Sequence, residues 1–256
     1  MSNNAIANER VIVFGASGFL GSHVADALSS AGYQVRLFDR SASPHLKPDQ
    51  EMIIGDIMNL DQVIEAARDC SVVYNFAAIA DIDEAHNKPI PTATINVLGN
   101  MHVLEAARIA GARRFVFASS VYVYSESGSF YRASKQAAER FTETYHERYG
   151  LDYNILRYGS LYGRRADKRN GIYRMLLEAV KNHSITYKGS GEAMREYIHV
   201  EDAARMSVQI LAPEFANRHL ILTGQEKMRI KDVMTMISEI LPWSVELHFD
   251  EANAVH

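Results

Sequence analysis

A glycine-rich turn between an apolar run and a helical pattern is the feature that most constrains the fold of this chain. The run RVIVF at residues 10–14 has the unbroken apolar character of a strand that is buried on both faces. GASGFLG follows at once at residues 15–21, and apolar residues at helical spacing then continue as far as Gly32. A strand, a tight turn and a helix in this order predict the first unit of a parallel α/β sheet.

The same alternation of apolar runs and helical patterns continues along the chain. Strands are predicted at residues 10–14, 35–38, 52–54, 72–76, 114–118, 153–157, 185–187, 219–222 and 245–249. The spacing of apolar residues predicts helices around 20–31, 60–67, 97–104, 138–145, 172–180, 204–211 and 230–240. Strands that alternate with helices form a parallel sheet through right-handed crossovers. The predicted fold class is therefore α/β, a Rossmann-type doubly wound parallel sheet, and the looser rhythm after Gly159 predicts a small C-terminal lobe.

Composition excludes several classes of protein. The chain has 256 residues, of which 47% are hydrophobic and 23% charged, a balance typical of globular proteins. Its formal net charge of -4 argues against a nucleic-acid partner. No apolar run approaches the roughly 20 residues that a membrane span needs, and the polar residues 1–9 are interpreted as a frayed terminus and not as a signal peptide.

Two further features concern cysteine and basic residues. The single cysteine, Cys70, cannot form a disulfide within the chain, which favours a reducing, cytoplasmic location, and it is expected to be a small buried hydrophobe. A short basic cluster is interpreted as a solvated loop, with a phosphate-facing loop as the alternative; it contains Arg164, Arg165, Lys168 and Arg169.

The glycine turn also carries a functional prediction. Without side chains at Gly15, Gly18 and Gly21, backbone N–H groups can approach a pyrophosphate, and the following helix directs its positive end at that charge. The turn therefore predicts dinucleotide binding, with a purely structural turn as the alternative.

Acidic residues at two strand ends refine the cofactor prediction. Asp39 ends the second strand, 24 positions after Gly15, where a carboxylate can bind an adenosine ribose and would repel a 2′-phosphate. This favours NAD, while the adjacent Arg40 keeps NADP open as the less favoured choice. Asp56 follows the third strand and could either contact the adenine amino group or cap a turn.

A tyrosine, a lysine and a serine form the candidate catalytic set. Tyr131 and Lys135 are four residues apart at the start of a predicted helix and so share one face. A phenol titrates near 10, but a nearby ammonium and a positive nicotinamide ring would favour the phenolate. Ser120 lies just past the carboxyl end of the fifth strand, where open parallel sheets place their chemistry, and its hydroxyl could hold the substrate oxygen while Tyr131 removes the proton.

These motifs, in this order, resemble the extended short-chain dehydrogenases/reductases, and most of all their NAD-dependent epimerase/dehydratase group that acts on nucleotide sugars. The resemblance spans roughly residues 11–241. It rests on GASGFLG, Asp39, Gly55-Asp56-Ile57, Asn75-Phe76-Ala77-Ala78, Ile95-Asn96-Val97, Ser119-Ser120 before Val123-Tyr124, Tyr131 with Lys135, Leu156-Arg157-Tyr158 and the segment from Arg195 to Asp202.

The resemblance implies roles for individual residues. Phe19 and Leu20 would cover the pyrophosphate, and Asp56 and Ile57 would flank the adenine. The remaining implied cofactor contacts are Ala77, Ala78, Ala80, Asn96 and Tyr158. For the substrate, Arg195 would bind phosphate, Tyr187 would lie near the base, and Ser160 stands beside the phosphate where the family often has Asn. His199 is interpreted as structural, and no histidine pattern indicates a metal site.

The resemblance also implies a division into domains. Residues 1–159, with about 198–222, would form the NAD-binding Rossmann domain, and residues 160–197 with 223–256 the small substrate-binding lobe. Only ten residues separate Ser120 from Tyr131, fewer than is usual in the family, so the sugar pocket is expected to be more open or differently shaped. The tail 251–256 has no stop signal, so either more chain follows or the lobe is unusually small.

Function and association follow from these roles. Val121 and Tyr122 stand where the dehydratases of the family have an acid/base pair, which argues against dehydration and favours a nucleotide-sugar epimerase, with C4 as the expected position. A dehydrogenase or reductase with the same catalytic set is the alternative, and a non-catalytic dinucleotide-binding protein the third choice. In the resembling family two helices pair into a dimer interface, so a homodimer that buries the helices around 97–104 and 138–145 is expected.

Overall fold

The computed structural model describes residues 9–250 and separates them into two compact units. The first unit contains residues 9–158 and 201–222, and the second contains residues 159–200 and 223–250. The expectations for the amino-terminal residues 1–8 and for the tail 251–256 lie outside the described residues.

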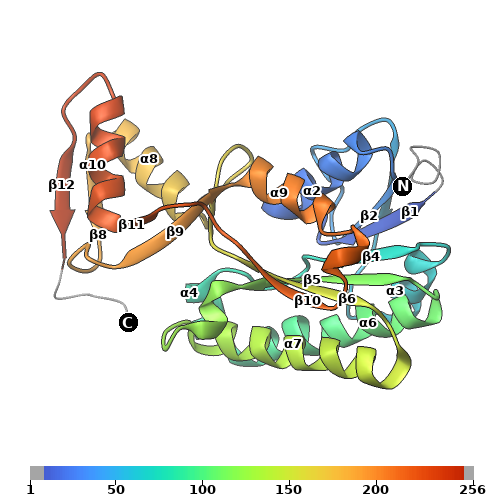
Figure 1. Cartoon of the computed structure of the whole chain (residues 1–256). Helices are drawn as coiled ribbons and strands as arrows, with labels where there is room; N and C mark the ends of the chain where they lie inside the picture. Colours follow the sequence, from blue (N-terminus) through green and yellow to red (C-terminus); the bar gives the residue numbers. More distant parts are fainter. Residues whose placement is uncertain (1–8, 251–256) are drawn as a thin grey trace. The chain divides into compact units, whose positions relative to one another are not determined.

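A parallel sheet forms the centre of the first unit (Figure 1). Within the described residues it has seven strands, in the spatial order β10 (Arg218–Leu222), β6 (Tyr153–Tyr158), β5 (Arg114–Ser120), β4 (Val72–Asn75), β1 (Arg10–Phe14), β2 (Gln34–Asp39) and β3 (Gln50–Ile54). Every neighbouring pair is parallel. The predicted doubly wound Rossmann-type fold is thereby confirmed.

Helices cover both faces of this sheet. Figure 1 shows α2 (Phe19–Ser30) and α9 (Val200–Gln209) on one face, with α6 (Asn100–Ile109) and α7 (Ser129–Tyr149) on the other. The helix α3 (Leu60–Ala67) packs against α6. Inaccessible side chains fill the layer beneath these helices, among them Ile12, Phe14, Leu104, Phe115 and Ile155. This burial on both faces explains why the strands are apolar without alternation.

The order of the strands reverses at one point of the sheet, between β1 and β4. β1 pairs with both β2 and β4, so the chain proceeds toward β3 on one side and toward β10 on the other. The carboxyl ends of β1 and β4 are adjacent, with Phe14 paired to Asn75. In open α/β sheets a ligand binds at such a switch point, and the loops after these two strands meet there.

The second unit has its own small core. Its strands are β7 (Ser160–Tyr162), β8 (Ser184–Tyr187), β9 (Met194–His199), β11 (Lys227–Arg229) and β12 (Glu246–Phe249), and its helices are α8 (Gly171–Asn182) and α10 (Ile230–Ile240). β9 lies between β7 and β11, while β8 pairs with β12. Buried Ala179, Ile185 and Met234 form the centre of the core.

Several short elements were not predicted. The strands β7, β9 and β11 are only partly buried, so they lack the apolar run that marks a core strand. The helix predicted around residues 97–104 begins earlier, as a π-helical turn at Thr94–Gly99 that continues into α6. The other short helices are α4 (Ile82–Asn87), α5 (Pro89–Ala93), and the 3₁₀ turns Val121–Tyr124 and Pro213–Phe215.

Within residues 9–250, the helices are all too short or too polar to span a bilayer. The same residues contain no group of three or more histidine, cysteine or acidic side chains arranged to hold a metal ion. Cys70 is 1% exposed, which confirms its predicted burial.

Candidate active site

The glycine turn brings bare backbone to the switch point of the sheet. Gly15 has φ +77°, and a Cβ atom added there would lie 2.5 Å from the backbone nitrogen of Ala77 in the loop after β4. A Cβ atom at Gly21 would collide with the carbonyl oxygen of Gly15. Gly18 caps α2 without a side chain. Gly15 and Gly21 therefore have no room for a side chain, and the turn leaves the amino end of α2 open to a phosphate.

Asp39 connects the end of β2 to this turn. Its Oδ2 accepts a hydrogen bond from the Ser17 backbone N–H at 2.9 Å, and its Oδ1 accepts one from the Arg40 N–H at 2.7 Å. Arg40 is exposed. The carboxylate is thus held in a fixed orientation next to the glycine turn. This orientation suits an acceptor for the hydroxyl groups of a ribose at this end of the sheet.

Asp56 and Ile57 lie in the loop after β3. The Asp56 Oδ1 accepts from the Met58 N–H at 2.9 Å, so the side chain caps the turn before α3. Ile57 is buried, and a Cβ atom on Gly99 would collide with its side chain. The sequence left two roles open for Asp56, and this contact agrees with the turn-capping role.

Asn96 links the loop after β4 to α7. Its Oδ1 accepts from the Ile79 N–H at 2.7 Å, while its Nδ2 donates to the Ile79 carbonyl at 3.0 Å and to Ser134 Oγ at 2.9 Å. These bonds engage the whole side-chain amide. Asn96 therefore anchors the segment that carries Ala77, Ala78 and Ala80 to α7.

The candidate catalytic side chains meet at the carboxyl end of β5. Ser120 is the last residue of β5, and Tyr131 and Lys135 occupy the first two turns of α7. The hydroxyls of Ser120 and Tyr131 are hydrogen-bonded to each other. The Lys135 Nζ donates to the Ala118 carbonyl at 2.7 Å and lies 5.7 Å from the centre of the Tyr131 ring.

Burial sets the charge state of this group. All three side chains are buried. Burial raises the pKa of Tyr131 to about 12, against the opposing effect of the Ser120 hydrogen bond. Burial lowers the pKa of Lys135 to about 8, against the opposing negative charge of Glu139. The protein alone thus keeps the phenol protonated at neutral pH, and the ammonium supplies the positive charge that favours its ionisation.

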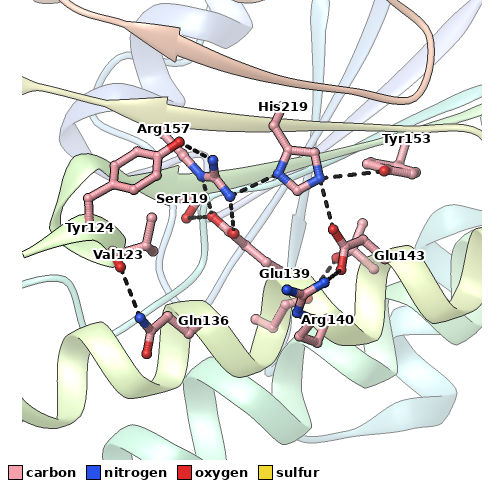
Figure 2. Close-up of polar contacts among 12 residues, drawn as sticks. Ser119, Val123, Tyr124, Gln136, Glu139, Arg140, Glu143, Tyr153, Arg157 and His219 are labelled. Atoms are coloured by element: carbon pink, nitrogen blue, oxygen red, sulfur yellow. Dashed lines mark hydrogen bonds and ion pairs between the residues drawn. The ribbon is translucent and has the colours of Figure 1, made fainter.

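A set of hydrogen-bonded polar residues around Glu139 and Arg157 was not predicted as part of the site (Figure 2). Glu139 lies one helical turn after Lys135 and accepts hydrogen bonds from Ser119 Oγ and the Arg157 guanidinium. The repeated spacing of four residues from Tyr131 to Lys135 to Glu139 is the signal that could have identified Glu139. Arg157 belongs to the Leu156-Arg157-Tyr158 motif, but its contact with Glu139 could not be predicted, because the pairing of β5 with β6 brings it to Ser119.

The remaining predicted cofactor residues have different surroundings. Phe19 and Leu20 form the first turn of α2 and are partly buried. Tyr158 is buried in the core, where its hydroxyl lies 2.6 Å from Ser207 Oγ and its ring packs against Phe76. Its polar atom is thus engaged within the protein.

The predicted substrate residues all lie in the second unit. Ser160 begins β7, where it pairs with Tyr197 of β9, and Arg195 is two residues earlier on β9. The structure therefore places these two on neighbouring strands, whereas Tyr187 ends β8 in the other sheet. The ring of His199 packs edge-on against Tyr162 at 5.3 Å. In the basic cluster Arg164, Lys168 and Arg169 are exposed.

Comparison with known proteins identifies a family model and a relative that match this chain. Residues 11–221 match the family model described as the NAD dependent epimerase/dehydratase family. A protein of Methanocaldococcus jannaschii, named provisionally as a UDP-glucose 4-epimerase, is 31% identical over 94% of this chain and 85% of its own length.

Solved structures of nucleotide-sugar epimerases are similar to this chain. The UDP-glucuronic acid 4-epimerase of Bacillus cereus, in complex with UDP-glucuronic acid and NAD, has a TM-score of 0.86 and 25% identity, covering 94% of this chain and 85% of its own. The UDP-glucose 4-epimerase of Thermotoga maritima with UDP-glucose has a TM-score of 0.87 at 24% identity with the same coverage, which demonstrates the shared fold.

Proposed function

The chain belongs to the NAD-dependent epimerase/dehydratase family, and on this premise we propose that it is an NAD-dependent nucleotide-sugar epimerase that acts at C4 of the sugar through a transient keto intermediate. The observation that carries the proposal is the buried set of Ser120, Tyr131 and Lys135 at the carboxyl end of β5. It lies at the same sheet edge as the glycine turn after β1.

The residues at the switch point fit NAD. Gly15 and Gly21 leave space that a Cβ atom would fill, so a pyrophosphate can approach the backbone at the amino end of α2. The Asp39 carboxylate, held by the Ser17 N–H, suits a ribose with free hydroxyls and opposes a 2′-phosphate. A bound NAD would supply the hydride acceptor for oxidation of the sugar carbon and the hydride donor for its reduction from the opposite face of the ring.

The protein's own side chains handle the proton. Once ionised beside the Lys135 ammonium and the positive charge of a bound NAD, Tyr131 Oη would take the proton of the C4 hydroxyl as the carbon is oxidised and give it back as the carbon is reduced. The Ser120 hydroxyl, hydrogen-bonded to Tyr131, holds the reacting oxygen. The Lys135 ammonium favours the phenolate because it stabilises the adjacent negative charge.

The second unit is assigned to the nucleotide part of the substrate. We infer that Arg195 and Ser160, on neighbouring strands, bind its phosphates, and that Tyr187 lies near the base. Support comes from the relatives named above, whose structures contain UDP-sugars. The product is a precursor for carbohydrate biosynthesis, and the single buried cysteine favours the cytoplasm.

We also propose a homodimer formed by α6 and α7. Large apolar side chains are exposed on this side: Leu98 is 44% exposed and Tyr149 54%, with Ile109 and Phe141 in the same class. Apolar surface of this kind is typical of an interface between subunits.

Substitution of the proposed base and an isotope label together test the function. Tyr131→Phe retains the ring, so NAD should still bind, while epimerisation of UDP-glucose or UDP-glucuronic acid should fall by roughly 10²–10⁴-fold. Tyr145→Phe, farther along α7 with its hydroxyl on Glu105, is the matched control and should leave the rate unchanged. Deuterium at C4 should remain in the product. Accumulation of NADH would instead support the dehydrogenase alternative, and an unchanged rate in Tyr131→Phe would refute the catalytic assignment.

A further inference from the structure

Glu139 of α7 and Arg157 of β6 form an ion pair with little exposure to solvent (Figure 2). Glu139 is 6% exposed. Its Oε1 accepts from Arg157 Nε at 2.9 Å and from Ser119 Oγ at 2.5 Å, and its Oε2 accepts from Arg157 Nη2 at 2.6 Å. The two-point contact with a guanidinium fixes the position of the carboxylate as well as balancing its charge.

Arg157 extends the contacts in two further directions. Its Nη1 donates to the hydroxyl of Tyr124, and its guanidinium carbon lies 4.7 Å from the centre of the Tyr124 ring. Its Nη2 is 2.9 Å from His219 Nδ1, and His219 Nε2 is 3.0 Å from Glu143 Oε1. Because an arginine can only donate, His219 Nδ1 accepts, and Nε2 carries the proton that faces Glu143.

The contacts to Ser119, Tyr124 and Glu139 lie on segments that hold a candidate catalytic group. Ser119 precedes Ser120 on β5, and Tyr124 ends the 3₁₀ turn that Ser120 caps. Glu139 lies one turn after Lys135 on the same face of α7. The pair therefore joins the strand, the turn and the helix whose relative placement sets the distance between Ser120 and Tyr131.

We propose that Glu139, clamped by Arg157, is a positioning residue that keeps the Lys135 ammonium charged in its buried site and fixes Ser120 against Tyr131. The inference rests on the proposed function for its catalytic consequence only. The groups that face Glu139 are Lys135 on α7, Ser119 on β5 and Arg157 on β6, with Tyr124, Glu143 and His219 beyond Arg157.

The electrostatic consequence has a definite sign. Burial lowers the pKa of Lys135, and the negative charge of Glu139 opposes this. Removing that charge should lower the pKa of Lys135 further, so the ammonium is lost at a lower pH. The pKa of Tyr131 should then rise, because the adjacent positive charge is lost. If the ion pair were purely structural, removing the charge of Glu139 would leave the pKa values of Lys135 and Tyr131 unchanged.

The direct test follows the titration of Lys135 without any substrate. Protein labelled with carbon-13 in its lysine side chains is titrated by NMR, and Lys135→Met identifies the Lys135 signal. Glu139→Gln should move its midpoint down by about one pH unit. Glu139→Asp, which keeps the charge, should move it less. Glu9→Gln is the matched control, because Glu9 makes the same two-point contact with Arg113 before the amino ends of β1 and β5.

A kinetic measurement adds the catalytic consequence. In Glu139→Gln the loss of kcat for UDP-glucose at high pH should begin about one pH unit lower, giving an about tenfold smaller kcat on that limb with little change in KM. If no nucleotide sugar is turned over, the proposed function fails, yet the Lys135 titration still decides this inference.

A second variant protects the test against misfolding. Glu139→Gln leaves the charge of the partly buried Arg157 without its carboxylate partner, which can destabilise the protein. The double variant Glu139→Gln/Arg157→Gln removes both charges and should also titrate Lys135 at a lower pH than the wild type. A Lys135 midpoint equal to that of the wild type in the folded single or double variant would overturn the proposal.

Discussion

Lys135 is the residue in which function and stability conflict. Its ammonium is buried and donates a hydrogen bond to the Ala118 carbonyl at 2.7 Å. Burial lowers its pKa from 10.5 to about 8. A lysine whose pKa is lower in the folded protein than in the unfolded chain makes its full contribution to stability above its unfolded pKa. That contribution is lost as the pH falls to and through its folded pKa, because the folded state must then hold a buried charge. At neutral pH the protein is therefore less stable than it would be with a neutral side chain at this position.

Lys135→Met should accordingly increase the free energy of unfolding at pH 7, by about 1–3 kcal/mol, while abolishing turnover. The gain should shrink between pH 8 and pH 10.5, where the wild-type lysine loses its charge in both states. Urea unfolding at several pH values measures this. Lys88→Met, at a surface lysine paired with Glu84, is the control and should show no such dependence. Equal stability of Lys135→Met and wild type at every pH would contradict the expected cost of the buried charge.

Asp39 determines the cofactor through its charge and its fixed orientation. Its carboxylate is held by the N–H groups of Ser17 and Arg40. NAD should therefore bind at least about tenfold more tightly than NADP, a difference of about 1.4 kcal/mol. Asp39→Asn keeps an oxygen for Ser17 and should reduce the preference. Calorimetric titration with both cofactors measures it, with Asp49→Asn, on the exposed turn before β3, as the control. Equal or tighter binding of NADP to the wild type would mean that Arg40 dominates.

Among the helices and loops, the contact through Asn96 joins the two halves of the candidate site. One amide side chain holds the loop after β4 through Ile79 and holds α7 through Ser134. Ser134 in turn donates to the Tyr131 carbonyl at 2.8 Å. A change at Asn96 should therefore reach both the cofactor loop and the proposed base.

Asn96→Ala should lower the free energy of unfolding by about 1–3 kcal/mol, because it removes both hydrogen bonds to the partly buried backbone of Ile79 and the one to Ser134. It should also weaken NAD binding and lower kcat. Asn59→Ala is the matched control: Asn59 caps α3 through the Gln62 N–H, and its loss should cost about 1 kcal/mol without changing kcat. Unfolding curves and steady-state kinetics separate the two. If Asn96→Ala, like Asn59→Ala, loses stability but keeps its affinity for NAD and its kcat, Asn96 has no role beyond folding.

For the whole molecule, the exposed apolar side chains of α6, α7 and the turn before α6 predict association. Leu98→Glu with Tyr149→Glu should convert the proposed dimer into a monomer, because charged side chains are costly in a buried interface. Light scattering at micromolar concentration measures the mass. Ile54→Glu, at a residue 62% exposed on the edge strand β3, is the control and should leave the dimer intact. A wild-type protein that is monomeric in this measurement would contradict the prediction.

The sequence by itself determined the features that depend on neighbouring residues. The period of the apolar residues identified the central strands and the main helices, and the turn chemistry of GASGFLG identified the site after β1. The spacing of Tyr131 and Lys135 placed both on one helix face, which α7 confirms. Local geometry is sufficient for such features, because a helix or a strand fixes the direction of side chains a few residues apart.

Only the tertiary structure decided which distant residues meet. Arg157 lies 18 residues from Glu139 and 62 from His219, and the pairing of β5, β6 and β10 alone brings them together. The strand β9 likewise depends on its partners, since its side chains are mostly half-buried and lack an apolar run. Hydrogen bonds between strands and the charges balanced across them depend on strand order. Strand order follows from the packing of the whole sheet and not from any local pattern.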